Sequence, residues 1–313
     1  MQDQPDYLDA DVAYLVGMIV GRGCFQQEGD IRRLTIRFPY RLPAMTTLPG
    51  SELDIDRETE LRLALDDVRR RVNELLEVDI DVERLSHEVI VKAVFTKNTM
   101  SWRNLRLLCG QAASHREMRV PPQIREAPDD LVREFLRGVA DTCAVPSAAD
   151  YFMQREGRQR VVLQFPQENW LLPLDVCYLL QVRLGIPVQG ILWGHPNIRA
   201  PAGGSWAKEH RLRVFADQFR PVGFNFAYKQ RAFEELASWN ETRAPGPARL
   251  CNPRARRVRR RKPRHPDEGD PRLPEALRRH FNAAFKVCLA LGCRQGRRVR
   301  TTTPDEEAEE LEQ

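Results

Sequence analysis

The strongest constraint on the fold is an apolar helical stretch that occurs twice in the chain. The two copies, AYLVGMIVGRGCF and FLRGVADTCA, lie 121 residues apart when counted from Gly17 to Gly138. Gly17 and Gly21 are four residues apart in the first copy, and Gly138 and Thr142 have the same spacing in the second. Residues at this spacing share one face of a helix, so small side chains there allow two helix backbones to approach closely. The repeat therefore predicts a central pair of helices, one from each half of a pseudo-twofold molecule.

The elements that follow each apolar stretch are predicted to come in the same order, namely helix, strand, strand, helix, strand, strand, helix. The evidence is strict alternation of polar and apolar residues in the strands and an apolar face at helical spacing in the helices. In the first half the assigned elements cover residues 8–21, 30–40, 57–76, 78–85, 87–96 and 99–108. In the second half they cover residues 131–142, 151–154, 158–166, 169–184, 186–196, 210–218 and 226–240.

This repeat divides the chain into segments. The predicted first half, linker, second half, basic extension and acidic disordered tail are residues 1–110, 111–127, 128–241, 242–300 and 301–313. In the linker, Pro121 and Pro122 are expected to stop any helix. The sequence therefore predicts an α+β fold of tandem αββαββα repeats with pseudo-twofold symmetry and a basic C-terminal extension.

Composition bounds the class of protein. Of the 313 residues, 42% are hydrophobic and 30% are charged, which suits a globular protein with a buried core. No apolar run approaches the roughly twenty residues that a membrane-spanning helix needs. The acidic start MQDQPDYLDADV lacks the layout of a signal peptide, and seven scattered cysteines argue against a disulfide framework. We expect an intracellular protein without a membrane partner.

The positive charge is concentrated towards the C-terminus. The net charge is +5, but residues 251–300 hold sixteen Lys or Arg against four Asp or Glu. A local excess of this kind favours a polyanionic partner. The densest run is expected to contact phosphates non-specifically, and it consists of Arg256, Arg257, Arg259, Arg260, Arg261 and Lys262.

The two apolar stretches resemble the motif of the LAGLIDADG family, best known as homing endonucleases. LVGMIVGRG and LRGVADTCA align with the nine-residue motif, GFNFAYKQRAFEELA resembles the last helix of single-chain members, and the resemblance covers roughly residues 8–241. It implies that the two motif helices pack at the centre of the molecule. It also implies that the two four-stranded sheets form a saddle that lies along the major groove of DNA.

The chain departs from this family at the positions that bind catalytic metal. The resemblance implies an acidic metal ligand at the penultimate residue of each motif, but Arg22 and Cys143 occupy these positions. A guanidinium repels a metal ion and a thiol is a poor ligand for Mg²⁺. Asp141 is the reserve carboxylate, although two residues along a helix turn it away from the ligand position. We expect no catalytic metal and no metal-dependent cleavage.

Alternation in the strands predicts which side chains face DNA. If one sheet face covers the helices, the other carries the polar residues, and arginine and glutamine there can form bidentate contacts with guanine and adenine. The alternative is an exposed sheet face that is simply solvated. The predicted DNA-facing residues are Arg33, Thr35, Arg37 and Lys92 in the first half, with Glu88 beside them, and Arg158, Arg160, Gln164, Arg211 and Arg213 in the second. Arg22 is expected to face the DNA phosphates at the end of its helix.

The basic extension has two open interpretations. Tetrahedral zinc accepts three cysteines and one histidine, and the extension contains Cys251, His265, Cys288 and Cys293, with His280 as a reserve ligand. The spacing fits no common zinc finger and no CxxC is present. The other interpretation is a helix with two packed cysteines and a loose arginine-rich arm.

The leading hypothesis is a double-stranded DNA-binding protein on a catalytically degenerate LAGLIDADG scaffold that recognises a long site without cutting it. It would act in a prokaryotic cytoplasm, bound to the nucleoid, as a monomeric regulator or as the recognition subunit of a partner enzyme, with zinc as its one candidate cofactor. One alternative is an active endonuclease, restriction-like or homing-like, with displaced or partner-supplied catalytic groups. Others are an RNA-binding splicing helper and a module that binds only proteins.

Overall fold

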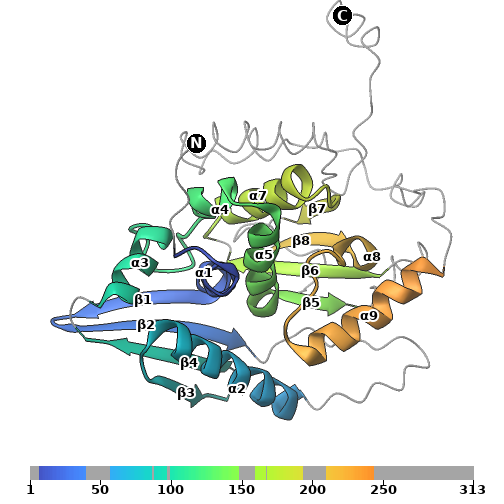
Figure 1. Cartoon of the computed structure of the whole chain (residues 1–313). Coiled ribbons are helices and arrows are strands. Elements are labelled where there is room, and N and C mark those ends of the chain that lie inside the picture. The colour runs from blue at the N-terminus through green and yellow to red at the C-terminus, as the bar shows by residue number, and fades with distance from the viewer. Residues whose placement is uncertain are drawn as a thin grey trace, which may run out of the picture.

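Two antiparallel sheets flank a central pair of helices in the computed structural model of the chain (Figure 1). The structure describes residues 7–39, 57–86, 88–96, 99–147, 159–166, 168–192 and 209–242. The first half comprises α1 (Ala10–Arg22), β1 (Gly23–Glu28), β2 (Ile31–Pro39), α2 (Arg57–Leu76), β3 (Ile80–Arg84), β4 (Glu88–Phe95) and α3 (Met100–Cys109). Its strands form a sheet in the order β1-β2-β4-β3.

The second half repeats this arrangement. It comprises α5 (Asp129–Cys143), β5 (Ala144–Ser147), β6 (Arg160–Pro166), α7 (Leu171–Tyr178), a π-helical turn η1 (Leu179–Arg183), β7 (Val188–Leu192), β8 (Glu209–Phe215), α8 (Ala216–Phe219) and α9 (Ala227–Glu241). Its sheet has the order β5-β6-β8-β7, which is the order of the first sheet with each strand replaced by its counterpart. The predicted fold of tandem αββαββα repeats is therefore confirmed.

Reciprocal glycine contacts hold α1 and α5 together. A Cβ atom added to Gly17 would overlap the carbonyl oxygen of Phe135, and one added to Gly138 would overlap the carbonyl oxygen of Tyr14. These two contacts are equivalent under the 121-residue repeat. The close approach of the two backbones therefore depends on the absence of a side chain at both positions.

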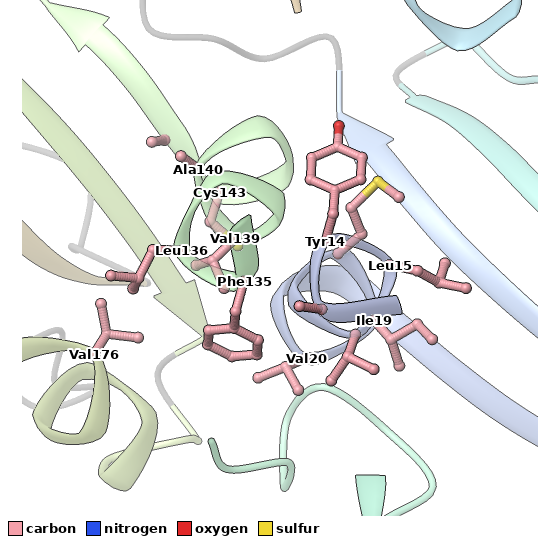
Figure 2. Packing of buried hydrophobic residues seen from close by; sticks show 14 of the residues in the cluster. Tyr14, Leu15, Ile19, Val20, Phe135, Leu136, Val139, Ala140, Cys143 and Val176 are labelled. Atoms are coloured by element: carbon pink, nitrogen blue, oxygen red, sulfur yellow. The ribbon is translucent and has the colours of Figure 1, made fainter. Parts of the chain in front are cut away.

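The core of the molecule surrounds this helix pair (Figure 2). Ile19 and Val20 of α1 and Phe135 and Val139 of α5 are completely buried, and Val176 of α7 packs beside them. Each such apolar side chain contributes about 1.5–3 kcal/mol on burial. Because both halves contribute to one continuous core, the relative position of the two sheets is set by packing.

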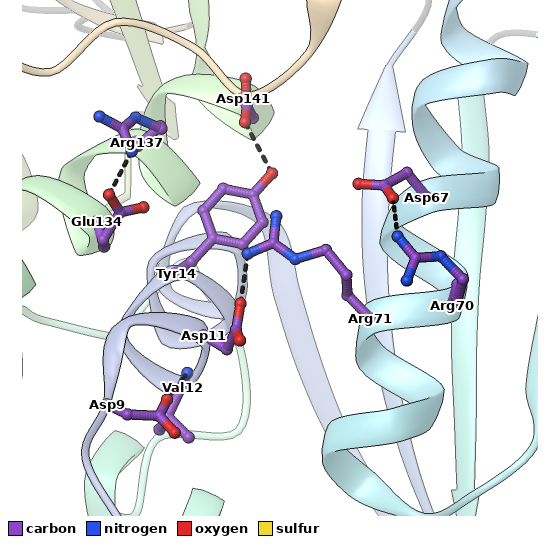
Figure 3. Close-up of polar contacts among 10 residues, drawn as sticks. All are labelled: Asp9, Asp11, Val12, Tyr14, Asp67, Arg70, Arg71, Glu134, Arg137 and Asp141. Carbon is purple, nitrogen blue, oxygen red and sulfur yellow. Dashed lines mark hydrogen bonds and ion pairs between the residues drawn. The ribbon is translucent and has the colours of Figure 1, made fainter.

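The ends of α1 place its last residue beside the second sheet. At the start, the Asp9 carboxylate accepts a hydrogen bond of 2.8 Å from the Val12 amide and caps the helix (Figure 3). At the other end, Gly23 turns into an extended conformation and begins β1 without an intervening loop. Arg22 is thus held at the junction of helix and strand.

The segment between the halves is more ordered than the predicted linker. Met118, Val120 and Ile124 in it are buried. The Phe25 amide of β1 donates to the Ala113 carbonyl oxygen (2.7 Å), so the segment extends the edge of the first sheet. A further contact joins it to the second half, where Asp175 of α7 accepts hydrogen bonds of 2.8 and 3.0 Å from the Arg119 guanidinium.

Two predictions about local structure need correction. Pro122 begins the short helix α4 (Pro122–Glu126), because proline is favoured in the first turn of a helix, where its missing N–H is not needed. Residues 216–218 are helical and belong to α8. The first strand of the second sheet is β5, which follows α5 directly as β1 follows α1; the predicted strand at 151–154 lies outside the described residues.

Among the described helices, none is long and apolar enough to span a membrane.

Candidate nucleic-acid interface

The last residues of the two central helices meet at the pseudo-twofold axis. Arg22 ends α1, and its Nη2 atom donates to Oε1 of Glu209, the first residue of β8 in the other half, over 3.3 Å. The Arg22 and Glu209 side chains are 16% and 32% exposed. Cys143 ends α5 at the equivalent position and is buried, and burial raises the pKa of its thiol. The axis therefore carries a partly exposed guanidinium paired across the two halves.

The two side chains do not fit the divalent cation that the family resemblance implies. The Arg22 guanidinium is a fixed positive charge. The Cys143 thiol stays protonated at neutral pH because burial raises its pKa, although the Thr142 hydroxyl, 3.6 Å from its sulfur, opposes the shift. Mg²⁺ requires hard anionic oxygens, so neither residue supplies a ligand for it.

Asp141 lies in the interior of the protein. The residue is 2% exposed, and its carboxylate accepts a hydrogen bond of 2.7 Å from the Tyr14 hydroxyl (Figure 3). It also accepts hydrogen bonds from the amides of Asn225 (3.1 Å) and Phe226 (3.3 Å). Burial raises the pKa of Asp141 to about 6, although Lys229 opposes the shift. In this conformation Asp141 joins α1, α5 and the start of α9 and has no access to a bound phosphate.

Lys229 is a buried cation close to the same helix end. It is 2% exposed, and its Nζ atom donates to the carbonyl oxygens of Asp141 (2.6 Å), Ala144 (3.0 Å) and Ala140 (3.4 Å). These carbonyls belong to the C-terminal end of α5, where a cation also interacts favourably with the helix dipole. Burial lowers the pKa of Lys229 to about 8, and the charge of Asp141 opposes this shift.

His115 lies next to the end of α1. Its Nδ1 atom is 3.1 Å from the Gly23 carbonyl oxygen, and because a carbonyl only accepts, Nδ1 carries the proton. Burial, together with the charges of Arg22, Arg116 and Arg37, lowers the pKa of His115 to about 4. The ring is therefore neutral at pH 7.

The outer face of the first sheet carries the predicted polar residues. Leu34, Ile36 and Phe38 point into the core, so Arg33, Thr35 and Arg37 lie on the opposite face, as the alternation predicts. Lys92 lies directly opposite Thr35 on β4 and shares this face.

Each cation on this face is paired with a carboxylate. Arg33 binds Glu28 over 3.1 Å and Arg37 binds Glu88 over 2.9 Å, while Lys92 forms an ion pair with Glu83. Glu88 is nearly buried. Alternation in the strands predicts Glu88 on this face, whereas Glu28 and Glu83 were not predicted there.

The outer face of the second sheet is arranged differently. Arg211 is exposed and lies opposite Gln164, which is only 8% exposed. Arg213 follows two residues later on the same face. The Arg160 guanidinium lies 5.7 Å from the centre of the Phe215 ring on the neighbouring strand. Gln164 is thus a mostly covered residue, whereas the arginines are at least partly accessible.

Several predicted residues lie outside the described part of the chain. They are Arg158, the basic run Arg256, Arg257, Arg259, Arg260, Arg261 and Lys262, and the zinc candidates Cys251, His265, Cys288, Cys293 and His280. Within the residues that the structure does describe, no three His, Cys, Asp or Glu side chains are grouped so that they could hold a metal ion. The zinc site stays a prediction.

Two residues of the axial region were missed by sequence reasoning. Glu209 is 121 residues after Glu88, the spacing of the motif copies, so applying the repeat to the predicted strand face would have identified it. Lys229 had no comparable signal, because a lysine in a helix is normally exposed.

Two αββαββα halves joined by a central helix pair define the structural class of this chain. No protein-family model and no curated protein match it. The similar solved structures include full-length DUF199/WhiA from Thermatoga maritima, with 13% identity and a TM-score of 0.41 over 76% of this chain and 62% of the WhiA chain. The chain thus spans less than two thirds of that protein.

Homing endonucleases are also among the similar structures. Mesophilic variants of I-DmoI match with 13% identity and a TM-score of 0.38, over 74% of this chain and 98% of theirs. I-WcaI bound to its DNA recognition sequence matches with 9% identity and a TM-score of 0.41, over 69% of this chain and 81% of that one.

Proposed function

We propose that this protein binds double-stranded DNA along the outer faces of its two sheets and does not cut it. The observation that carries the proposal is a set of cations at equivalent positions of the two sheets. Arg33 and Arg160 lie three residues before the core residues Ile36 and Leu163, which hold equivalent positions in the two registers. A duplex has pseudo-twofold symmetry of its own, so two such faces suit two halves of one site.

Strands of this kind can recognise DNA directly. The major groove admits β-ribbons, and arginine donates two parallel hydrogen bonds to the edge of guanine. Lys92 and Arg213 form a second pair of cations, 121 residues apart, on the central strands β4 and β8. Four cations on equivalent strands therefore provide both phosphate and base contacts.

The absence of cleavage is proposed from the residues at the axis. Arg22 and Cys143 stand where the family resemblance implies metal-binding carboxylates, and neither fits a divalent cation. Arg22 is instead suited to neutralise a DNA phosphate at the centre of the site. A protein that holds a duplex in this way would serve as a regulator or as the recognition subunit of a partner enzyme.

Selection from a random duplex library tests the proposal. We expect a long motif with partial twofold symmetry, and binding that weakens steeply as salt is raised. Competition between the selected duplex and single-stranded or hairpin RNA separates DNA binding from the RNA hypothesis. Failure to enrich any duplex sequence, with no binding at low salt, would contradict the proposal.

One observation favours the alternative of an active nuclease. Glu88 and Glu209 are two carboxylates at equivalent positions of the two sheets, and Glu209 lies within 3.3 Å of Arg22 at the end of α1. Both are paired with arginines, Glu88 with Arg37 and Glu209 with Arg22. Incubation of the selected duplex with Mg²⁺ or Mn²⁺ tests it: cleavage by the wild type that is lost in Glu88→Gln and Glu209→Gln would establish the nuclease.

A further inference from the structure

The two sheet faces carry different balances of charge. On the first face, the three cations predicted to meet DNA are matched by Glu28, Glu88 and Glu83. A further carboxylate, Asp81, lies directly opposite Lys92. Among the described residues of its strands, this face therefore carries no excess of positive charge.

The second face has an excess of positive charge in its described strands. Arg160, Arg211 and Arg213 lie on it with one carboxylate, Glu209. That carboxylate is bound by Arg22, which belongs to α1 of the other half. Over the described strands, the second face therefore carries a net positive charge and the first does not, so the strands of the second sheet attract a polyanion more strongly.

The difference in charge between the two faces bears on two separate contributions to DNA binding, contacts with phosphates and contacts with bases. Contacts with phosphates release counterions and supply most of the salt-dependent affinity, whereas contacts with base edges supply specificity. A face that lacks excess positive charge adds little to the first contribution. The first face does combine hydrogen-bond donors with acceptors. Its arginine and lysine side chains can donate to guanine, and its carboxylates can accept from cytosine.

The ion pairs of the first face are suited to exchange with bases. The Arg33 and Glu28 side chains are 39% and 68% exposed, and those of Lys92 and Glu83 are 31% and 42% exposed. Exposed ion pairs contribute little to stability. Opening them towards a base edge therefore costs little, while their cross-strand arrangement keeps the groups in position.

On the basis of the proposed function, we infer that the two sheets divide the work of DNA binding: the sheet of β5–β8 holds the phosphate backbone, and the sheet of β1–β4 discriminates between bases. The two half-sites are then unequal. The half-site under the first sheet has the stricter sequence, and the half-site under the second sheet supplies most of the electrostatic affinity.

Two matched variants of the full chain test this inference. Arg211→Gln removes one cation from the second face. The double variant Lys92→Gln with Glu83→Gln removes an ion pair from the first face and leaves the net charge unchanged. For each protein, binding to the selected duplex is measured by fluorescence anisotropy over a range of salt concentrations, and the library selection is repeated.

For Arg211→Gln we expect the slope of log affinity against log salt to fall by about 0.9, with the same selected sequence. For the double variant we expect an unchanged slope and altered base preferences confined to one side of the motif. The inference is overturned if both variants shift the slope alike, or if Arg211→Gln changes the preferred bases and the double variant does not.

These outcomes are separate from failure of the proposed function. A wild type that binds no duplex at any salt concentration overturns both ideas. A wild type that binds and selects a motif, with variants that behave alike, retains DNA binding and overturns only the division between the sheets. Melting temperatures of the variants, compared with wild type, show that the exposed substitutions leave the fold intact.

Discussion

Asp141 and Lys229 stabilise each other's helix ends. Asp141 belongs to α5, and its carboxylate accepts the amides of Asn225 and Phe226 just before α9. Lys229 belongs to α9, and its ammonium group donates to three carbonyls at the end of α5. The last helix of the second half is thereby fixed to the central pair by two buried charges whose hydrogen-bonding groups are satisfied.

Substitution of the buried lysine tests this arrangement. In Lys229→Met the carbonyls at the end of α5 lose their donor and Asp141 loses its nearby cation. Removing one partner of a buried polar network in this way should lower the free energy of unfolding by about 3 kcal/mol or more. Unfolding in urea measures this loss. Arg231→Met on the same helix is the control, because Arg231 is exposed and paired with Glu60 at the surface, and we expect a loss of about 1 kcal/mol at most. Equal losses in the two variants would contradict the assigned role.

A second prediction concerns the small residues at the contact between α1 and α5. A Cβ atom at Gly21 would overlap the Thr142 hydroxyl, a side-chain atom, whereas one at Gly17 would overlap the backbone carbonyl of Phe135. Both Gly21→Ala and Gly17→Ala should therefore destabilise the protein, by about 1–3 kcal/mol or more. Adding Thr142→Ala should recover part of the loss in Gly21→Ala, because the Cys143 sulfur also lies 3.0 Å from the added atom, and none of the loss in Gly17→Ala. Thermal unfolding of these four variants, compared with the wild type and with Thr142→Ala alone, measures this, and equal rescue of both would show that the helices do not pack in this register.

The glycine spacing shows how much of the fold was accessible from the sequence. Two helices with small residues at the same spacing, 121 residues apart, predicted the contact between α1 and α5, and alternation in β2 predicted which side chains leave the core. Both signals are local and periodic. The pairing of Arg22 with Glu209 was not predicted, since these residues are 187 positions apart and meet only after both halves have folded.

Local patterns also gave no account of how charges are compensated. Arg33 and Lys92 were predicted as DNA contacts from alternation alone, but their carboxylate partners lie on neighbouring strands and depend on register. Pro121 and Pro122 are predicted to stop any helix, but the effect of a proline depends on whether a helix precedes or follows it, and Pro122 begins α4. The pattern of a strand specifies a face, and the chemistry of that face depends on its neighbours.

The third prediction concerns pH. Burial and nearby arginines lower the pKa of His115 from 6.5 to about 4 in the folded protein. The unfolded chain therefore binds more protons between these values, and the contribution of His115 to stability is present above pH 6.5 and is lost as the pH falls through 4. His115→Asn removes the titration, and its amide can still donate to the Gly23 carbonyl. We expect the free energy of unfolding of the wild type, relative to that of His115→Asn, to fall by on the order of 2 kcal/mol between pH 7 and pH 4. Urea unfolding at several pH values measures it, and parallel curves for the two proteins would refute it.

The last prediction returns to the two positions at the axis. The double variant Arg22→Asp with Cys143→Asp replaces a cation and a thiol by two carboxylates next to Glu209. Without metal, repulsion among three acids should lower the melting temperature in EDTA. Mn²⁺ should raise it again in a concentration-dependent way, because a ligand that binds only the folded state stabilises that state. The wild type and the variant Arg22→Ala with Cys143→Ala should show no such response. A double carboxylate variant that folds, binds DNA and ignores Mn²⁺ would show that these residues do not occupy metal-binding positions, and would remove the ground for treating the axis as a degenerate catalytic centre.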